Sequence, residues 1–158
     1  MSRKAVEFRP VEPADITWLA EHLRAQDVAE VHACGHRDLA HVVRAGVARS
    51  VWSRTATVDG EVAAIFGVAP LLTLMDPRGV PWMLGTDLVP ANRGALARHA
   101  APYIQQMLGT FPHLVNIVHA KNTVAVRWLR RVGFTLREPI PHGPEGEMFH
   151  LFEMHRHV

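Results

Sequence analysis

The chain has 158 residues, of which 48% are hydrophobic and 20% are charged, and its formal net charge is +2 at pH 7. These values predict a single globular domain over residues 1–158 and exclude a low-complexity chain. We find no apolar run long enough to span a membrane, no apolar export signal and no block of like charges. The single cysteine, Cys34, excludes an internal disulfide framework and fits a reducing compartment. We therefore expect neither a membrane nor a nucleic-acid partner.

Apolar spacing predicts the element order β, α, α, β, β, β, α, β, α, β, β along the chain. The expected strands are residues 5–11, 51–58, 61–70, 80–89, 113–120, 134–140 and 147–155. The expected helices are residues 15–24, 36–50, 91–109 and 121–132, while residues 26–35 fit a short helix or a loop. Pro102 should kink the third of these helices or begin a new one, and Gly109 should end it.

Two turns indicate how the strands pair. Asp59-Gly60 between two β-rich runs predicts a hairpin. Residues 76–79 predict a second turn, between the apolar run 71–75 and the strand at 80–89, so the third and fourth strands should be antiparallel neighbours. The strand–helix–strand–helix order after residue 80 predicts one parallel pair at the centre. The expected fold is α+β, with one mixed sheet and helices on both faces.

Residues 116–134 are the most informative stretch of the sequence. Asn122 suits a helix N-terminus, where its side chain can accept a backbone N–H, and Gly133 suits the left-handed residue that ends a helix. Phe134 then begins a strand. As pure structure this pattern needs no ligand. The side chains expected to point inward from this helix are Val124, Ala125, Trp128, Leu129 and Val132.

The element order, with Asn122, Ala125, Gly133 and Phe134 at this spacing, resembles the GNAT (Gcn-five-related N-acetyltransferase) superfamily. The resemblance implies a strand splayed from its parallel neighbour, with the arm of acetyl-CoA or CoA in the gap. It also implies a helix N-terminus directed at the diphosphate. The residues that would hold this cofactor are Leu88, Val89, Arg93, Gly94 and Asn122.

Several positions of this chain depart from the family's pattern. Pro90, Arg93 and Gly94 match the usual entry to the helix, but Leu96 replaces a required glycine and Arg98 a small residue. Leu129 stands where many relatives carry a tyrosine that protonates the departing thiolate. The resemblance therefore implies a cofactor loop that is only half present.

The resemblance leaves the proton acceptor to be chosen from this chain's own residues. Asp87, expected on the fourth strand, and His119, at the end of the fifth, are the two candidates, although His119 also fits a plain strand-end histidine. Asp27, Glu30 and His36 are the expected acceptor-pocket residues, on the basis of position alone.

A narrower resemblance concerns function. Residues 24–35, 81–89, 105–118 and 122–134 resemble podophage GNAT-like proteins, including a small internal virion protein. This resemblance implies a phage or prophage component of the virion or its assembly, located in the host cytoplasm or the virion and bound to other virion proteins. The alternative is an active N-acetyltransferase that modifies a small amine or a protein amine.

No cysteine pair with zinc spacing, no phosphate-binding P-loop and no nucleophile elbow is present. His155 and His157 would share one face of a strand and could chelate a metal, but a solvated terminus is the favoured interpretation. We therefore expect no metal. Trp128 should lie in the core, with Arg127, Arg130 and Arg131 on a solvated face of the same helix.

Overall fold

A computed structural model describes residues 3–73 and 75–157, and within them six helices and eight strands form one body. The strands are β1 (Val6–Arg9), β2 (Trp52–Val58), β3 (Glu61–Pro70), β4 (Arg78–Gly85), β5 (His113–His119), β6 (Thr135–Leu136), β7 (Ile140–His142) and β8 (Glu147–His155). The helices are α1 (Pro13–His22), α2 (Ala25–Ala33), α3 (Leu39–Arg49), α4 (Leu88–Ala91), α5 (Arg93–Thr110) and α6 (Thr123–Arg131). None of these helices combines the length and apolarity needed to cross a bilayer.

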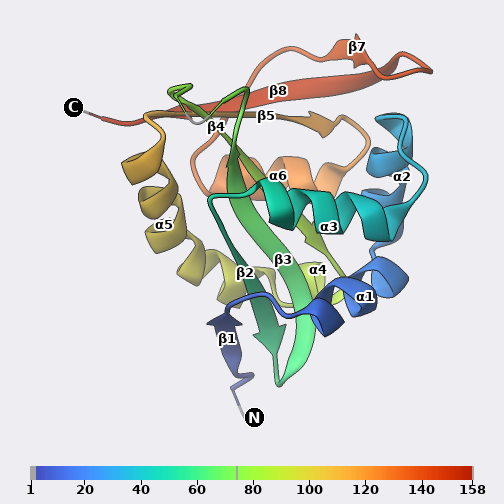
Figure 1. The fold of residues 1–158 in the computed structure, drawn as a ribbon, viewed down its shortest axis with the longest axis vertical. Helices are drawn as coiled ribbons and strands as arrows, with labels where there is room; N and C mark the ends of the chain where they lie inside the picture. Colours follow the sequence, from blue (N-terminus) through green and yellow to red (C-terminus); the bar gives the residue numbers. More distant parts are fainter. Residues whose placement is uncertain (1–2, 74, 158) are drawn as a thin grey trace.

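The strands form one mixed sheet in the order β1-β2-β3-β4-β5-β8-β6, with β7 paired to β8. All pairs are antiparallel except β4 with β5. In Figure 1, β5 and β8 run across one end of the sheet at a steep angle to β2, β3 and β4. The α+β class, the mixed sheet and the central parallel pair are therefore confirmed.

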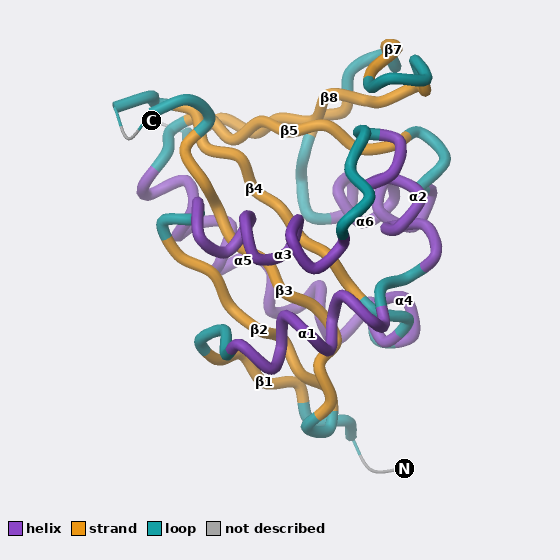
Figure 2. Tube along the Cα trace, turned by 45° about the vertical axis from the view of Figure 1, so that its right-hand side comes forward, coloured by secondary structure: helices purple, strands orange, loops and turns teal. Residues whose placement is uncertain are grey.

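Helices cover both faces of the sheet, as expected (Figures 1 and 2). On one face, Leu19 of α1 and Val43 of α3 pack against Ile65 of β3, and all three are fully buried. On the other face, α5 and α6 share a larger core with β3, β5 and β8, made of Val68, Ile104, Met107, Leu108, Phe111, Leu114, Val118, Val126, Phe134 and Phe152. The strand β3 therefore contributes to the cores on both faces of the sheet, with Ile65 on one face and Val68 on the other, because side chains alternate along a strand.

The predicted hairpin is present, with Asp59 at φ 50° and Gly60 at φ 83°. Both residues are left-handed, as a two-residue type I′ turn requires, and β2 and β3 pair on either side. Of residues 26–35, left open between helix and loop, residues 26–33 belong to α2, and the helix ends before Cys34.

Several predicted boundaries are wrong. The fourth strand ends at Gly85 rather than continuing to residue 89, because the Thr86 hydroxyl accepts the amide of Leu88 (3.3 Å) and starts the turn that becomes α4. The predicted turn at residues 76–79 ends earlier than expected, because Arg78 and Gly79 already belong to β4. The predicted strand 134–140 is broken into β6 and the start of β7.

The helix α5 also differs from expectation. It runs through Pro102 and Gly109 to Thr110. Pro102 leaves the carbonyl of Arg98 without its helical partner, but both residues are exposed, so water can satisfy that carbonyl.

The inward face of α6 is only half buried. Val126, which the spacing did not select, is the buried residue of this helix, at 8% exposed. Val124, Ala125, Trp128, Leu129 and Val132 are intermediate, and all five line a cavity. Arg127, Arg130 and Arg131 are exposed as expected. The helix therefore borders an opening as well as the core.

Candidate active site

The parallel strands β4 and β5 pair only at one end. Their two aligned pairs are Arg78 with His113 and Gly79 with Leu114, and beyond these the strands separate. Alternate residues of β4 bond to β3, so Pro81, Met83 and Gly85 direct their backbone polar groups at the gap. Because Pro81 lies on this unpaired side, its missing N–H does not weaken the β3–β4 ladder.

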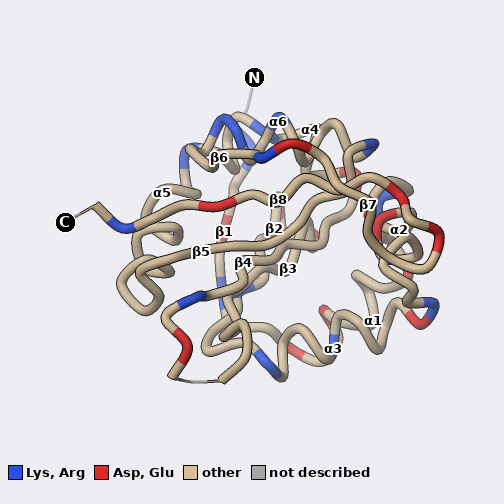
Figure 3. Tube along the Cα trace, turned by 90° about the horizontal axis from the view of Figure 1, so that it is seen from above, with Lys and Arg blue, Asp and Glu red and all other residues tan. Residues whose placement is uncertain are grey.

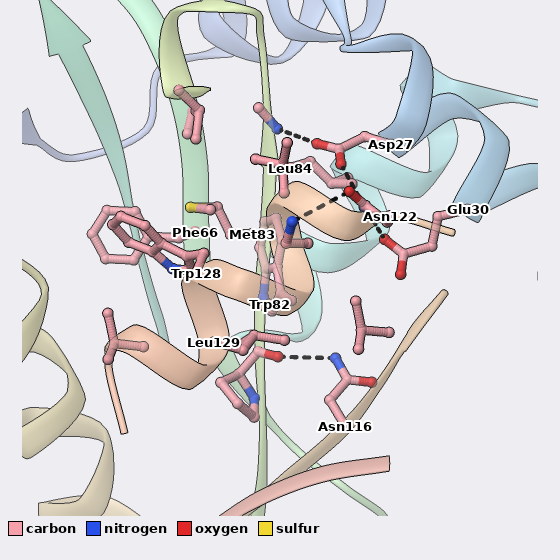
Figure 4. Close-up of a pocket in the computed structure, with 18 of the residues that line it drawn as sticks. Asp27, Glu30, Phe66, Trp82, Met83, Leu84, Asn116, Asn122, Trp128 and Leu129 are labelled. Carbon is pink, nitrogen blue, oxygen red and sulfur yellow. Dashed lines mark hydrogen bonds between the residues drawn. The ribbon is translucent and has the colours of Figure 1, made fainter. Parts of the chain in front are cut away.

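The gap leads into a cavity of about 540 Å³ between the two strands, α2, α5 and α6. One side chain crosses it: Asn116 of β5 donates from Nδ2 to the Pro81 carbonyl over 2.9 Å (Figure 4). Leu129 and Trp128 of α6 form part of the opposite wall. The cavity is mainly apolar, with a polar cluster at its α2 end.

Two carboxylates of α2 bond the open ends of the separated strands. The Oδ2 atom of Asp27 accepts the amide of Gly85, the last residue of β4, over 2.9 Å. The Oε1 atom of Glu30 accepts the amide of His119, the last residue of β5, over 2.5 Å. These two acids are three residues apart and share one face of the helix. The helix α2 thus bridges the ends of strands that do not bond to each other.

Asn122 joins the two carboxylates and begins α6. It is 1% exposed, and its Nδ2 donates to Asp27 Oδ1 and to Glu30 Oε2, each over 3.2 Å. Its Oδ1 accepts the amide of Ala125 over 3.4 Å, so the predicted helix-capping role is confirmed. Figure 4 shows Asp27, Glu30 and Asn122 converging at one end of the cavity. The same side chain therefore ends a loop and organises the polar cluster.

The electrostatic settings of the two acids differ. Asp27 forms an ion pair with Arg24 (2.8 Å), and both side chains are only 7% exposed. Burial raises the pKa of Asp27, and the Arg24 charge opposes that rise. Burial also raises the pKa of Glu30, to about 7, and the negative charge of Asp27 adds to the effect. Among the described residues, Glu30 has no cation within ion-pair distance.

The two residues predicted to accept a proton lie elsewhere. Asp87 is exposed at the start of α4, so its predicted place in an apolar strand is wrong. His119 does end β5, and it is 4% exposed. Its ring packs against Phe149 and its Nε2 lies 3.0 Å from Glu147 Oε1, so the ring faces β8 rather than the cavity. Its backbone, but not its ring, contacts the polar cluster, since its amide donates to Glu30 and its carbonyl accepts the amide of Asn122.

The predicted acceptor-pocket residues are partly brought together. Asp27 and Glu30 both belong to the polar cluster, whereas His36 lies exposed on the loop after α2 and borders the cavity from there. Arg24 and Asn116 escaped the sequence prediction. Arg24 precedes the helix and shows no periodic signal, and Asn116 acquires its role only because the strands separate.

The predicted cofactor residues fall into two groups. The amides of Leu88 and Val89 donate to Thr86, at 3.3 and 3.1 Å, and the Val89 side chain is 3% exposed. The amides of Arg93, Gly94 and Ala95, at the start of α5, have no acceptor among the described residues. The space above Gly94 is also open to 4 Å. The first turn of α5 is therefore the part of this segment that can receive an anion.

Leu96 does not stand over that turn. It is 7% exposed and packs against Ala56, Ala64 and Val89 on the sheet side of α5. Arg93, in this first turn, and Arg127 and Arg131 of α6 also line the cavity. Figure 3 shows basic residues along α6, on the side of the sheet away from α1 and α3.

No protein-family model matches the sequence, and no curated protein matches it. The fold, however, is similar to those of solved acetyltransferases. Ard1 from Thermoplasma volcanium matches with a TM-score of 0.72 and 11% identity, over 98% of this chain and 99% of that one. The acetyltransferase of GNAT family from Streptococcus pneumoniae matches with a TM-score of 0.63 and 14% identity, over 96% of this chain and 100% of that one. The chain has the GNAT fold.

A third match concerns the cofactor. The aminoglycoside acetyltransferase AAC(6')-Ib, solved in complex with coenzyme A, matches this GNAT fold with a TM-score of 0.70 and 16% identity, over 96% of this chain and 95% of that one. The fold is therefore one that can hold coenzyme A. None of these three structures is described as a phage protein.

Proposed function

We propose that the chain is an acetyl-CoA-dependent N-acyltransferase whose general base is Glu30. The observation that carries the proposal is the setting of this carboxylate, which lines the cavity where β4 and β5 separate and has a pKa raised to about 7. A base whose pKa lies near the working pH is the most effective at removing a proton. Asp27 is less suited to the role, because Arg24 already holds it in an ion pair.

The residues of the cavity support a direct transfer. When bound, acetyl-CoA supplies the acyl group as a thioester. Glu30 takes the proton that the acceptor nitrogen loses as the new C–N bond forms, and the hydrogen bonds from Asn122 and the His119 amide hold the carboxylate in place. Leu129 has no proton for the departing sulfur, so that proton comes from water.

The cavity also supports binding of the cofactor. The backbone N–H and C=O of Met83 face the gap between the separated strands, where no neighbouring strand bonds to them. An extended ligand arm can take the place of that missing strand. The free amides at the start of α5 and the side chains of Arg93, Arg127 and Arg131 provide positive potential at the other end. These residues fit a ligand with an amide-containing arm and a phosphorylated end.

The acceptor we propose is an amine that carries a positive charge in solution, loses that first proton to water on binding, and attacks the thioester as the neutral amine. Asp87 is close enough to Asp27 for its charge to raise the pKa of that acid, and Arg24 offsets only one of the carboxylates around the cluster. A cationic small amine or protein amine therefore meets a negative potential at the α2 end of the cavity.

The test combines binding and turnover. Acetyl-CoA is titrated calorimetrically into the wild type and Glu30→Gln, and a panel of amines is screened for release of free thiol. We expect both proteins to bind acetyl-CoA equally. We expect Glu30→Gln to lower kcat/KM by roughly 100-fold or more and to abolish the limb of the pH profile near pH 7.

The matched control is Glu61→Gln, which makes the same change at an exposed acid at the start of β3 that does not line the cavity. It should keep activity within about twofold. Equal activity of Glu30→Gln and the wild type would contradict the role of Glu30 as the general base but would not contradict the transferase activity. Wild type that binds no acetyl-CoA at millimolar concentration would overturn the function itself.

A virion or assembly component, as in podophages, is a second proposal. One observation in its favour is Leu129, which stands where many relatives of the fold carry a tyrosine that acts as the general acid. The other is the pair of apolar side chains Leu72 and Met75, which are 74% and 90% exposed and suit contacts with other proteins. Absence of acetyl-CoA binding, together with recovery of the chain from purified phage particles, would support this role over the enzyme.

A further inference from the structure

A cluster of three metal-ligating side chains lies at the end of the sheet away from the cavity. It consists of His113, the first residue of β5, with Glu153 and His155 near the end of β8. His113 and His119 are the two ends of β5, which puts the cluster about 20 Å from the polar cluster of the active site. No step of the proposed transferase uses it.

The strand register explains why the three residues meet. His113 and His155 are direct partners in the β5–β8 ladder, and Glu153 is two residues before His155 on the same face. The two imidazole rings are stacked, with centroids 4.0 Å apart and planes at 13°. One ligand atom from each of the three residues lies within 4.8 Å of the other two.

The carboxylate is held in place for both rings. Arg137 donates to Glu153 Oε1 over 2.6 Å. Glu153 Oε2 lies 3.7 Å from His113 Nε2, and Glu153 Oε1 lies 3.7 Å from His155 Nε2. Arg156 fixes the end of β8 against α5 by donating from Nε to the carbonyl of Leu108 over 2.7 Å. The cluster therefore sits on a part of the strand that is anchored on both sides.

One atom of the cluster is unsatisfied. His113 Nε2 is buried and has no hydrogen-bond partner among the described residues. A buried polar atom without a partner is costly, and a bound metal ion is one of the groups that can satisfy it. The 3.7 Å distances to Glu153 are too long for hydrogen bonds, and the three ligand atoms lie within 4.8 Å of one another, around a space that one ion can share.

We propose that His113, Glu153 and His155 bind a divalent metal ion, Zn²⁺, which links β5 to β8. Two imidazole nitrogens and one carboxylate oxygen form a ligand set that zinc accepts, with a fourth position left for water. This site differs from the pairing of His155 with His157 that the sequence suggested, because its second histidine comes from the neighbouring strand. The ion would link the ends of β5 and β8 at the end of the sheet where β4 and β5 pair.

The test is titration of tag-free protein with zinc sulfate against a chromophoric chelator, with thermal melting alongside. We expect one Zn²⁺ per chain and a raised Tm for the wild type. His113→Ala and His155→Ala should each weaken binding by at least tenfold and lose the Tm increase. His150→Ala is the matched control, because His150 lies on the opposite face of β8 and bonds to the Arg137 carbonyl; it should bind as the wild type does.

Thermal melting of each variant without zinc checks that the variant folds. If His113→Ala does not fold, His113→Asn replaces it in the titration. No zinc binding by the wild type at 100 micromolar would overturn the proposal. So would binding that is lost in His155→Ala but unchanged in the His113 variants, since that pattern belongs to a surface chelate at the C-terminal end. Neither result bears on acetyl-CoA turnover.

Discussion

The two ends of the cavity are built in different ways. At the α2 end, Asp27, Glu30 and Asn122 are bonded to each other and to the last residues of β4 and β5. At the α5 end, the amides of the first helical turn have no acceptor among the described residues, and the nearby arginines are exposed. The first end is rigid and already organised for chemistry. The second is open and suits a charged ligand that brings its own acceptors.

The largest expected effect comes from breaking the organised end. Asn122→Ala removes both hydrogen bonds to the carboxylates and the cap of α6, and it leaves charged groups buried without their donor. We expect a loss of about 4 kcal/mol in the free energy of unfolding, measured by urea denaturation.

The control for that variant is Asn92→Ala at the open end. Asn92 also precedes a helix, but its side chain only donates to the Leu88 carbonyl and is half buried. A loss of about 1 kcal/mol is expected. Equal losses in the two variants would contradict the difference between the two ends.

The second prediction concerns pH. The pKa of Glu30 is about 7 in the folded chain, against an ordinary value of 4.5. Between these values the folded state holds a proton that the unfolded state has lost, so stability is full at low pH and falls as pH rises through 7. The decrease should reach about 3 kcal/mol by pH 8. Glu30→Gln should remove it.

Urea denaturation of both proteins at several pH values between 5 and 8 measures this slope. All other titratable groups are common to both proteins and cancel in the comparison. Parallel curves for Glu30→Gln and the wild type would show that the Glu30 carboxyl is not perturbed.

The third prediction concerns the open end. Arg93→Ala, Arg127→Ala and Arg131→Ala should each weaken the binding of coenzyme A roughly 3- to 10-fold, and added salt should reduce the difference. Pantetheine lacks the phosphates and should bind all three variants as it binds the wild type. Calorimetric titration of both ligands measures the effect.

Arg44→Ala is the control for this series, because Arg44 is an exposed arginine of α3 on the other side of the sheet. It should leave both affinities unchanged. A loss of pantetheine affinity in the arginine variants would place these side chains along the arm of the ligand instead of at its charged end.

The smallest expected effect concerns the link across the gap. Asn116→Ala removes the partly buried hydrogen bond to the Pro81 carbonyl and the bond that Asn116 Oδ1 accepts from the Ile117 amide, and it should cost about 1 kcal/mol in stability. If this bond closes the gap to a ligand, the association rate of acetyl-CoA should rise, as stopped-flow fluorescence would show. Asn116→Asp, which cannot donate to the carbonyl, should behave alike. An unchanged rate in both variants would mean that Asn116 only supports the strands.

Some of this molecule could be predicted from the sequence alone. Asp59-Gly60 encodes a turn whose left-handed residues leave few alternatives, and the alternation around it specifies two paired strands. Asn122 and Gly133 mark the ends of α6 through local backbone chemistry, and the element order leads to the mixed sheet. These features depend on contacts between residues close in the chain, so local pattern is sufficient.

The arrangement of the site was decided by tertiary structure. Asp87 was expected on a strand and lies exposed at the start of α4, because the hydroxyl of Thr86 turns the chain one residue earlier. The pKa of Glu30 is raised because folding buries its carboxyl near Asn122 and the end of β5, which are distant in sequence, and the charge of Asp27, three residues earlier on α2, adds to the effect. His113 meets His155 through the β5–β8 register in the same way. Burial and charge at a site depend on such long-range contacts, and no periodicity in a single sequence encodes them.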